Sequence, residues 1–103
     1  MNAIEAVCSK VWDAARQVGY KKVASACGVT ADLVGRMSSV GQRVEELARA
    51  QRERAAIPVG TAAHKSAGLE VTSAEGALAK AVSVVSDHDV AKVGATIRHV
   101  EGK

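Results

Sequence analysis

The sequence predicts an all-α domain of five to six helices. Apolar residues recur at steps of three and four through most of the 103 residues, which is the spacing of helices with one buried face. Alanine and valine dominate the apolar content, with one tryptophan, one tyrosine and no phenylalanine. A chain of this length can form a core without disulfides or metal, but small side chains each bury little area, which favours self-association.

The first helix is predicted between Asn2 as its N-cap and Gly19 as the residue that ends it. One apolar stripe runs along it, with polar residues on the other side. We expect Trp12 to anchor this stripe, because a lone aromatic residue in such a position usually packs in the core. The stripe consists of Ile4, Val7, Cys8, Val11, Trp12, Ala15 and Val18.

Two short helices joined by a tight turn are predicted over Tyr20–Ser39. Gly28 permits the positive φ that the turn requires. Thr30 is in N-cap position for the second helix, and Asp32 in its first turn favours the positive end of the helix dipole. This second helix is expected to end within residues 38–41.

A further helix is predicted from Val40 or Gly41 to Ile57, because the only proline, Pro58, cannot continue it. These first 57 residues form the predicted helix-turn-helix core, with the motif at residues 20–39.

Residues 58–72 are predicted to be a linker, since they are rich in Gly, Ala, Ser and Thr without a clear period. Leu69–Thr72 could form a short extended piece. Residues 73–103 are predicted to be a helical segment used for oligomerisation or packing, either one long helix or a hairpin with a capping box at Ser86–Asp89. Its apolar stripes consist of Leu78, Ala81, Val82, Val85, Val90, Val93, Ile97 and Val100.

The stretch Tyr20–Ser39 satisfies the steric requirements of a helix-turn-helix. A small residue, Ala24, stands where the second helix must cross closely, and Gly28 stands at the turn. DNA-binding regulators use this unit to enter a major groove, although a helical hairpin in a non-binding protein can have the same pattern. The inward positions hold Val23, Cys27, Val29, Val34 and Met37.

This motif resembles the helix-turn-helix of small phage and plasmid transcriptional regulators, in particular the lambda CII activator type. The resemblance covers residues 10–40, with Gly19 before the motif, the run Val23–Val29 and a second helix that begins with polar residues. It implies dimers or tetramers that bind repeated half-sites on double-stranded DNA. The C-terminal half of the chain has no counterpart in the resemblance.

The outward positions of the second motif helix are the candidate DNA-binding residues. Arg36 is the strongest base reader, because a guanidinium can pair bidentately with guanine. Asp32 could accept from cytosine N4 or only cap its helix. Lys21, Lys22 and Arg43 could meet backbone phosphate, or could belong to an ordinary solvated face. The outward positions are Thr30, Ala31, Asp32, Gly35, Arg36 and Ser39.

The net charge of +3 is unevenly placed. Residues 1–57 hold nine Lys and Arg against six Asp and Glu, whereas residues 58–103 hold five against five. The excess positive charge therefore lies in the half with the motif, as an anionic partner would favour.

Enzymatic, metal-binding and membrane functions have little support. Cys8 and Cys27 lack metal-like spacing and are expected to be small core residues in a reducing cytoplasm. His64, His88 and His99 are isolated from one another, and no P-loop, dinucleotide fingerprint or nucleophile elbow occurs. No apolar run is long enough to span a membrane. We therefore expect a cytoplasmic protein that is not an enzyme and needs no cofactor.

The sequence thus predicts a sequence-specific DNA-binding transcriptional regulator that acts as a homodimer or tetramer. Whether it activates or represses would depend on the position of its site and on contacts with RNA polymerase, neither of which the sequence shows. The alternative is a small helical protein-protein interaction module, an adaptor or inhibitor, in which the motif serves only to pack helices.

Overall fold

The computed structural model describes residues 2–101, and the side chains of residues 2–97. It contains five α-helices and, within that range, no strand, so the predicted all-α fold of five to six helices is confirmed. The helices are α1 (Ala3–Val18), α2 (Tyr20–Cys27), α3 (Ala31–Ala55), α4 (Ala62–Val82) and α5 (Asp87–Glu101).

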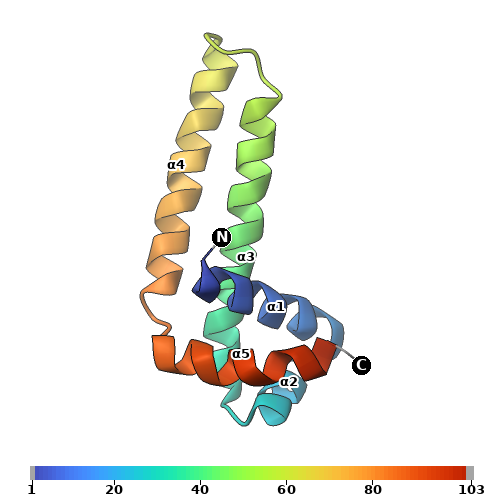
Figure 1. Ribbon diagram of the computed structural model, residues 1–103. Coiled ribbons are helices and arrows are strands. Elements are labelled where there is room, and N and C mark those ends of the chain that lie inside the picture. Colours follow the sequence, from blue (N-terminus) through green and yellow to red (C-terminus); the bar gives the residue numbers. More distant parts are fainter. Residues whose placement is uncertain (1, 102–103) are drawn as a thin grey trace.

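The molecule is elongated, measuring 49 × 26 × 19 Å along its principal axes. The long helix α3 extends along it, and α4 returns antiparallel beside α3 (Figure 1). Helices α1, α2 and α5 gather around the N-terminal half of α3, and we call this part the body. We call residues 48–74, where α3 and α4 continue beyond the body, the distal hairpin.

The ends of α1 are capped as the sequence predicts. The Asn2 side chain accepts a hydrogen bond from the Glu5 N–H at 2.8 Å, and Gly19 ends the helix with a φ of 90°. Trp12 is half-buried, and its indole N–H donates to the Glu45 carboxylate of α3 at 2.8 Å. It therefore joins α1 to α3 at the edge of the core, whereas Cys8 and Val11 fill the centre.

Helix α3 is continuous, and the break predicted within residues 38–41 is absent. Gly41 lies in the helix interior and is buried. A Cβ atom there would come within 2.5 Å of the Cys8 carbonyl oxygen and 2.6 Å of the Trp12 Cβ. The glycine thus allows α1 to cross α3 closely, a long-range requirement that imitates a local helix end.

The prediction of a linker at residues 58–72, with an extended piece at Leu69–Thr72, is wrong. Only a short turn separates α3 from α4, and α4 begins after Thr61, whose hydroxyl oxygen accepts from the His64 N–H at 3.1 Å. The segment lacked an apolar period because this part of α4 buries only Ala67 and Val71.

The C-terminal segment is broken into two helices at residues 83–86. The Ser86 hydroxyl oxygen accepts from the Asp89 N–H at 3.2 Å, which confirms the predicted cap. Helix α5 packs against α1 and α2, so the stripe predicted for oligomerisation or packing is used for packing within the chain. On α5 the buried members of this stripe are Val90, Val93 and Ile97, while the side chains of His99 and Val100 lie outside the described residues.

Both cysteines are free and buried in the body, as predicted for small core residues. Burial raises the pKa of the Cys8 thiol to about 11 and also raises the pKa of the Cys27 thiol, because the charged thiolate is disfavoured away from water.

Candidate nucleic-acid interface

Helices α2 and α3 are joined by a connection of three residues, 28–30. Gly28 adopts the left-handed conformation, with φ 66° and ψ 36°, and the next N–H, that of Val29, donates to the Ala24 carbonyl at 3.0 Å. The Thr30 hydroxyl oxygen then caps α3 by accepting from the Leu33 N–H at 3.1 Å. The predicted glycine turn and threonine cap are both confirmed.

The inward face of the motif is packed as predicted. Val23, Val34 and Met37 are fully buried, and Ala24 and Cys27 are each 5% exposed. The remaining inward position, Val29, is half-buried against the same core. The steric pattern in the sequence therefore identified the buried face of the helix-turn-helix.

The first turn of α3 forms the open part of the outward face. Thr30, Ala31 and Asp32 are exposed there, at the end of the molecule opposite the distal hairpin (Figure 1). Gly35 is less open, because the Tyr20 ring at the start of α2 lies 3.8 Å from the position that a Cβ of Gly35 would occupy. Ser39 is half-buried. Among these predicted outward positions, the exposed ones are therefore those of the first turn of α3.

Arg36 is engaged within the chain. Its guanidinium donates to the Val84 carbonyl at 3.0 Å, and its Nε atom lies 3.2 Å from the Asp32 carboxylate. The predicted base reader therefore connects α3 to the turn between α4 and α5. Sequence reasoning missed this contact because Val84 lies 48 residues further along the chain.

The other candidate cations lie in two separate places. Lys21 and Lys22 are exposed on the first turn of α2. Arg43 lies on α3, seven residues beyond Arg36, and donates to both carboxylate oxygens of Glu46 at 3.0 and 2.8 Å. Only the two lysines belong to the same end of the molecule as the first turn of α3.

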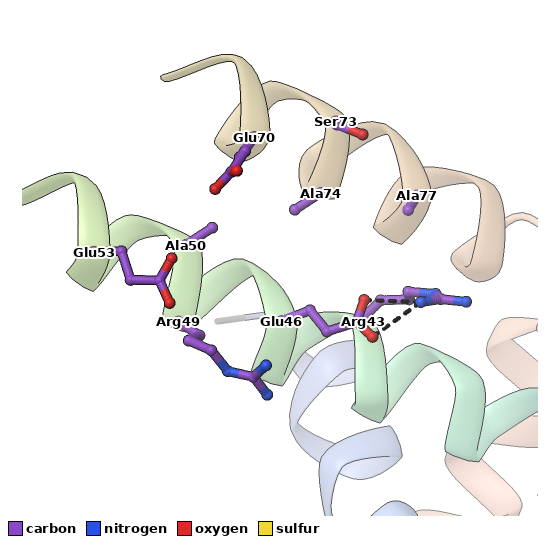
Figure 2. A pocket seen from close by; sticks show the side chains of 9 residues that line it. All are labelled: Arg43, Glu46, Arg49, Ala50, Glu53, Glu70, Ser73, Ala74 and Ala77. Atoms are coloured by element: carbon purple, nitrogen blue, oxygen red, sulfur yellow. Dashed lines mark hydrogen bonds and ion pairs between the residues drawn. The ribbon is translucent and has the colours of Figure 1, made fainter. Parts of the chain in front are cut away.

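A groove between α3 and α4 was not predicted. We call it the hairpin groove; it has a volume of about 430 Å³ and lies partly along the distal hairpin (Figure 2). A stripe at helical spacing on α3 could have indicated it, but the placement of α4 beside α3 is a long-range feature, and Glu70 falls in the segment predicted as a linker. The lining residues are Arg43, Glu46, Arg49, Ala50, Glu53, Glu70, Ser73, Ala74 and Ala77.

The described residues contain no group of three or more His, Cys, Asp and Glu that could hold a metal ion. None of the helices in that part of the chain is both long and apolar enough to cross a bilayer. Comparisons with protein-family models, with curated proteins and with solved structures found no match to the chain.

Proposed function

We propose that the protein binds double-stranded DNA in a sequence-specific manner through α2 and α3, as a transcriptional regulator that acts as a homo-oligomer. The observation that carries the proposal is the left-handed turn at Gly28, which joins a packed inner face to an exposed first turn of α3. In helix-turn-helix proteins the N-terminal residues of the second helix contact base edges.

Each exposed residue of that first turn has a role that its chemistry allows. The Thr30 hydroxyl can donate to a base or a phosphate while its oxygen caps the helix. The Ala31 methyl group can contact a thymine methyl, and the Asp32 carboxylate can accept from cytosine N4. Lys21 and Lys22 supply positive charge for the phosphate backbone beside them.

Arg36 could read a base only after leaving the Val84 carbonyl and Asp32. Two effects of Arg36→Ala can then be told apart. Loss of a base contact would cost about 1–3 kcal/mol of binding free energy at one base pair only. Loss of a structural contact would weaken binding to all sequences alike. We expect the second pattern in the protein as folded, because both contacts are intramolecular.

Binding to a mixed-sequence duplex as a function of salt concentration tests the proposal. Fluorescence anisotropy with the double variant Lys21→Ala/Lys22→Ala should show weaker binding, with the salt slope reduced by about 0.9 for each lost phosphate contact. Lys80→Ala is the control: it removes an exposed lysine from the last turn of α4, outside α2 and α3, and should leave the salt slope of binding unchanged. Absence of binding at low salt, or equal slopes for all three proteins, would overturn the proposal.

A helical protein-protein interaction module is the second candidate. The observation that favours it is that Arg36 and Arg43, two of the candidate DNA-contacting cations, are paired within the chain. This function predicts no salt-dependent affinity for duplex DNA, so the same titration separates the two candidates.

A further inference from the structure

The hairpin groove has a floor of small side chains and a rim of charged ones. Ala50 from α3 and Ala74 from α4 project toward one another in its middle (Figure 2). Side chains of this size allow another helix to approach within the 8–10 Å at which helix axes pack. Other helices can therefore approach α3 and α4 closely along the groove, and the charges of its rim decide which helices fit.

The charges on the rim are arranged unevenly along the groove. Glu53 and Glu70 lie toward the tip of the hairpin, whereas Arg49 and the Arg43–Glu46 pair lie toward the body (Figure 2). The tip half therefore carries two negative charges, and the body half carries one net positive charge. The side chains of Arg49, Glu53 and Glu70 have no hydrogen bond or ion pair among the described residues.

The distal hairpin is also weakly supported by its own packing. Ala67 and Val71 are its only buried residues, and both lie outside the core cluster of the body. Leu69, one turn before Ser73 on α4, is 67% exposed. Most of the stability of a helix in a protein comes from tertiary packing of its apolar face, and residues 48–74 have little of it. An additional layer of helices would supply that packing.

From these observations we infer that the hairpin groove is a self-association surface, and that its occupant is the groove of a second copy of this chain. A two-fold axis near Ala50 and Ala74 would pack two hairpins antiparallel as a four-helix bundle. The tip half of one groove then faces the body half of the other. Glu53 and Glu70 meet Arg49 of the partner subunit, so the two carboxylates that have no partner in one chain gain one opposite charge in the pair.

The proposed function already calls for an oligomer; the location of its interface is the new element, and it stands whether or not the protein binds DNA. The proposed dimer also sets the distance between the two helix-turn-helix motifs. Ala50 lies nineteen positions beyond Ala31 on α3, so the first turns of the two copies would lie about 57 Å apart. This exceeds the spacing of about 34–36 Å between half-sites one helical turn apart.

Sedimentation equilibrium of the full chain tests the interface with two adjacent substitutions. Ser73 and Thr72 are both exposed on α4, but only Ser73 lines the groove. Ser73→Arg should raise the dimer dissociation constant by about tenfold or more, while Thr72→Arg should leave it nearly unchanged. Circular dichroism should show the same helix content for both variants, which separates loss of association from loss of folding.

Reversal of charge provides a second test. Arg49→Glu and Glu70→Arg should each weaken the dimer, and the double variant should recover most of the lost affinity, because it restores opposite charges across the two-fold axis. Arg52→Glu is the control, since Arg52 is exposed on the same helix outside the groove.

Three results would overturn the inference. They are a wild-type chain that stays monomeric at high micromolar concentration, equal effects of Ser73→Arg and Thr72→Arg, and a double charge reversal weaker than either single variant. A dimer that fails to bind DNA would instead overturn the proposed function alone. A monomer that binds DNA would overturn the interface and the homo-oligomeric part of the proposed function, and would leave the proposed DNA binding intact.

Discussion

The body and the distal hairpin bury their apolar residues to very different extents. The core cluster of the body includes fully buried residues from α1, α2, α3 and α5, such as Val11, Val23, Met37 and Val93. The distal hairpin contributes no residue to this cluster among those described and buries only Ala67 and Val71. The body therefore has a core of its own, whereas the hairpin would be stabilised by the proposed second copy.

The difference in packing also distinguishes the two proposed binding surfaces, the motif on the body and the hairpin groove. The motif is held rigidly because its inner face is part of the body core, which suits a surface that must keep a set geometry. The groove lies on two helices that bury few residues in the distal hairpin, which suits a surface that becomes stable on assembly. Four pairs of measurements would break or sharpen this comparison.

The largest effect is expected from core truncation. Met37 is fully buried in the body, so Met37→Ala should lower the free energy of unfolding by about 2–5 kcal/mol. Val71→Ala in the hairpin should cost less, about 1–2 kcal/mol, since it removes two methyl groups from a thin interface. Urea unfolding followed by circular dichroism measures both. Equal losses would mean that the hairpin is packed as tightly as the body.

Glycine substitutions should have opposite signs in the two regions. At Gly41 a methyl group would collide with the Cys8 carbonyl and Trp12, so Gly41→Ala should destabilise by about 1–3 kcal/mol. At Gly68, in the distal hairpin, the nearest atom to an added Cβ is the Arg54 Nε at 3.6 Å, an ordinary van der Waals contact, so Gly68→Ala should stabilise by about 0.5–1 kcal/mol. Thermal unfolding reports both shifts, and a stabilising Gly41→Ala would refute the close crossing of α1 and α3.

Two threonine caps with the same 3.1 Å geometry offer a matched pair. Thr30→Ala, at the start of α3, should cost about 1 kcal/mol of global stability, because that turn is continuous with the body core. Thr61→Ala, at the tip, should mainly speed amide exchange in the first turns of α4. Hydrogen-exchange mass spectrometry with peptide resolution distinguishes the two. Faster amide exchange throughout the body of the Thr61→Ala variant would contradict the division into body and distal hairpin.

The smallest response is expected from the native cysteines. Cys8 and Cys27 should not react with a thiol reagent at pH 8, because burial hides both and raises their pKa values. A cysteine introduced by Ser73→Cys on the exposed rim of the hairpin groove should react readily in the monomer. Rapid labelling of Cys8 or Cys27 in the native protein would contradict the burial of both thiols in the core.

Because folding raises the pKa of the Cys8 thiol from 9.0 to about 11, the contribution of this thiol to stability is complete below pH 9 and is lost as the pH rises through 11.

Local features of the fold could be predicted from the sequence. Asn2, Thr30 and Ser86 were identified as caps, and Gly19 and Gly28 as helix ends, because each acts within a few residues of its own position. The inward face of the motif was found for the same reason, since its spacing alone defines it.

Long-range features could not be predicted. The role of Gly41 depends on α1, and the engagement of Arg36 depends on Val84 in another part of the chain. The start of α4 was missed because residues 62–72 bury so little that no apolar period is visible. The hairpin groove was missed because it depends on α4 lying antiparallel beside α3, which no local pattern in the sequence shows.

Selection of binding sites from a pool of random duplexes, with the full chain as bait, tests the central claim most directly. We predict enrichment of a short motif that the Thr30→Ala and Asp32→Ala variants change at defined base pairs, with any repeated copies more than one helical turn apart. No enriched motif, or one that is unchanged in both variants, would contradict the claim that the first turn of α3 reads DNA.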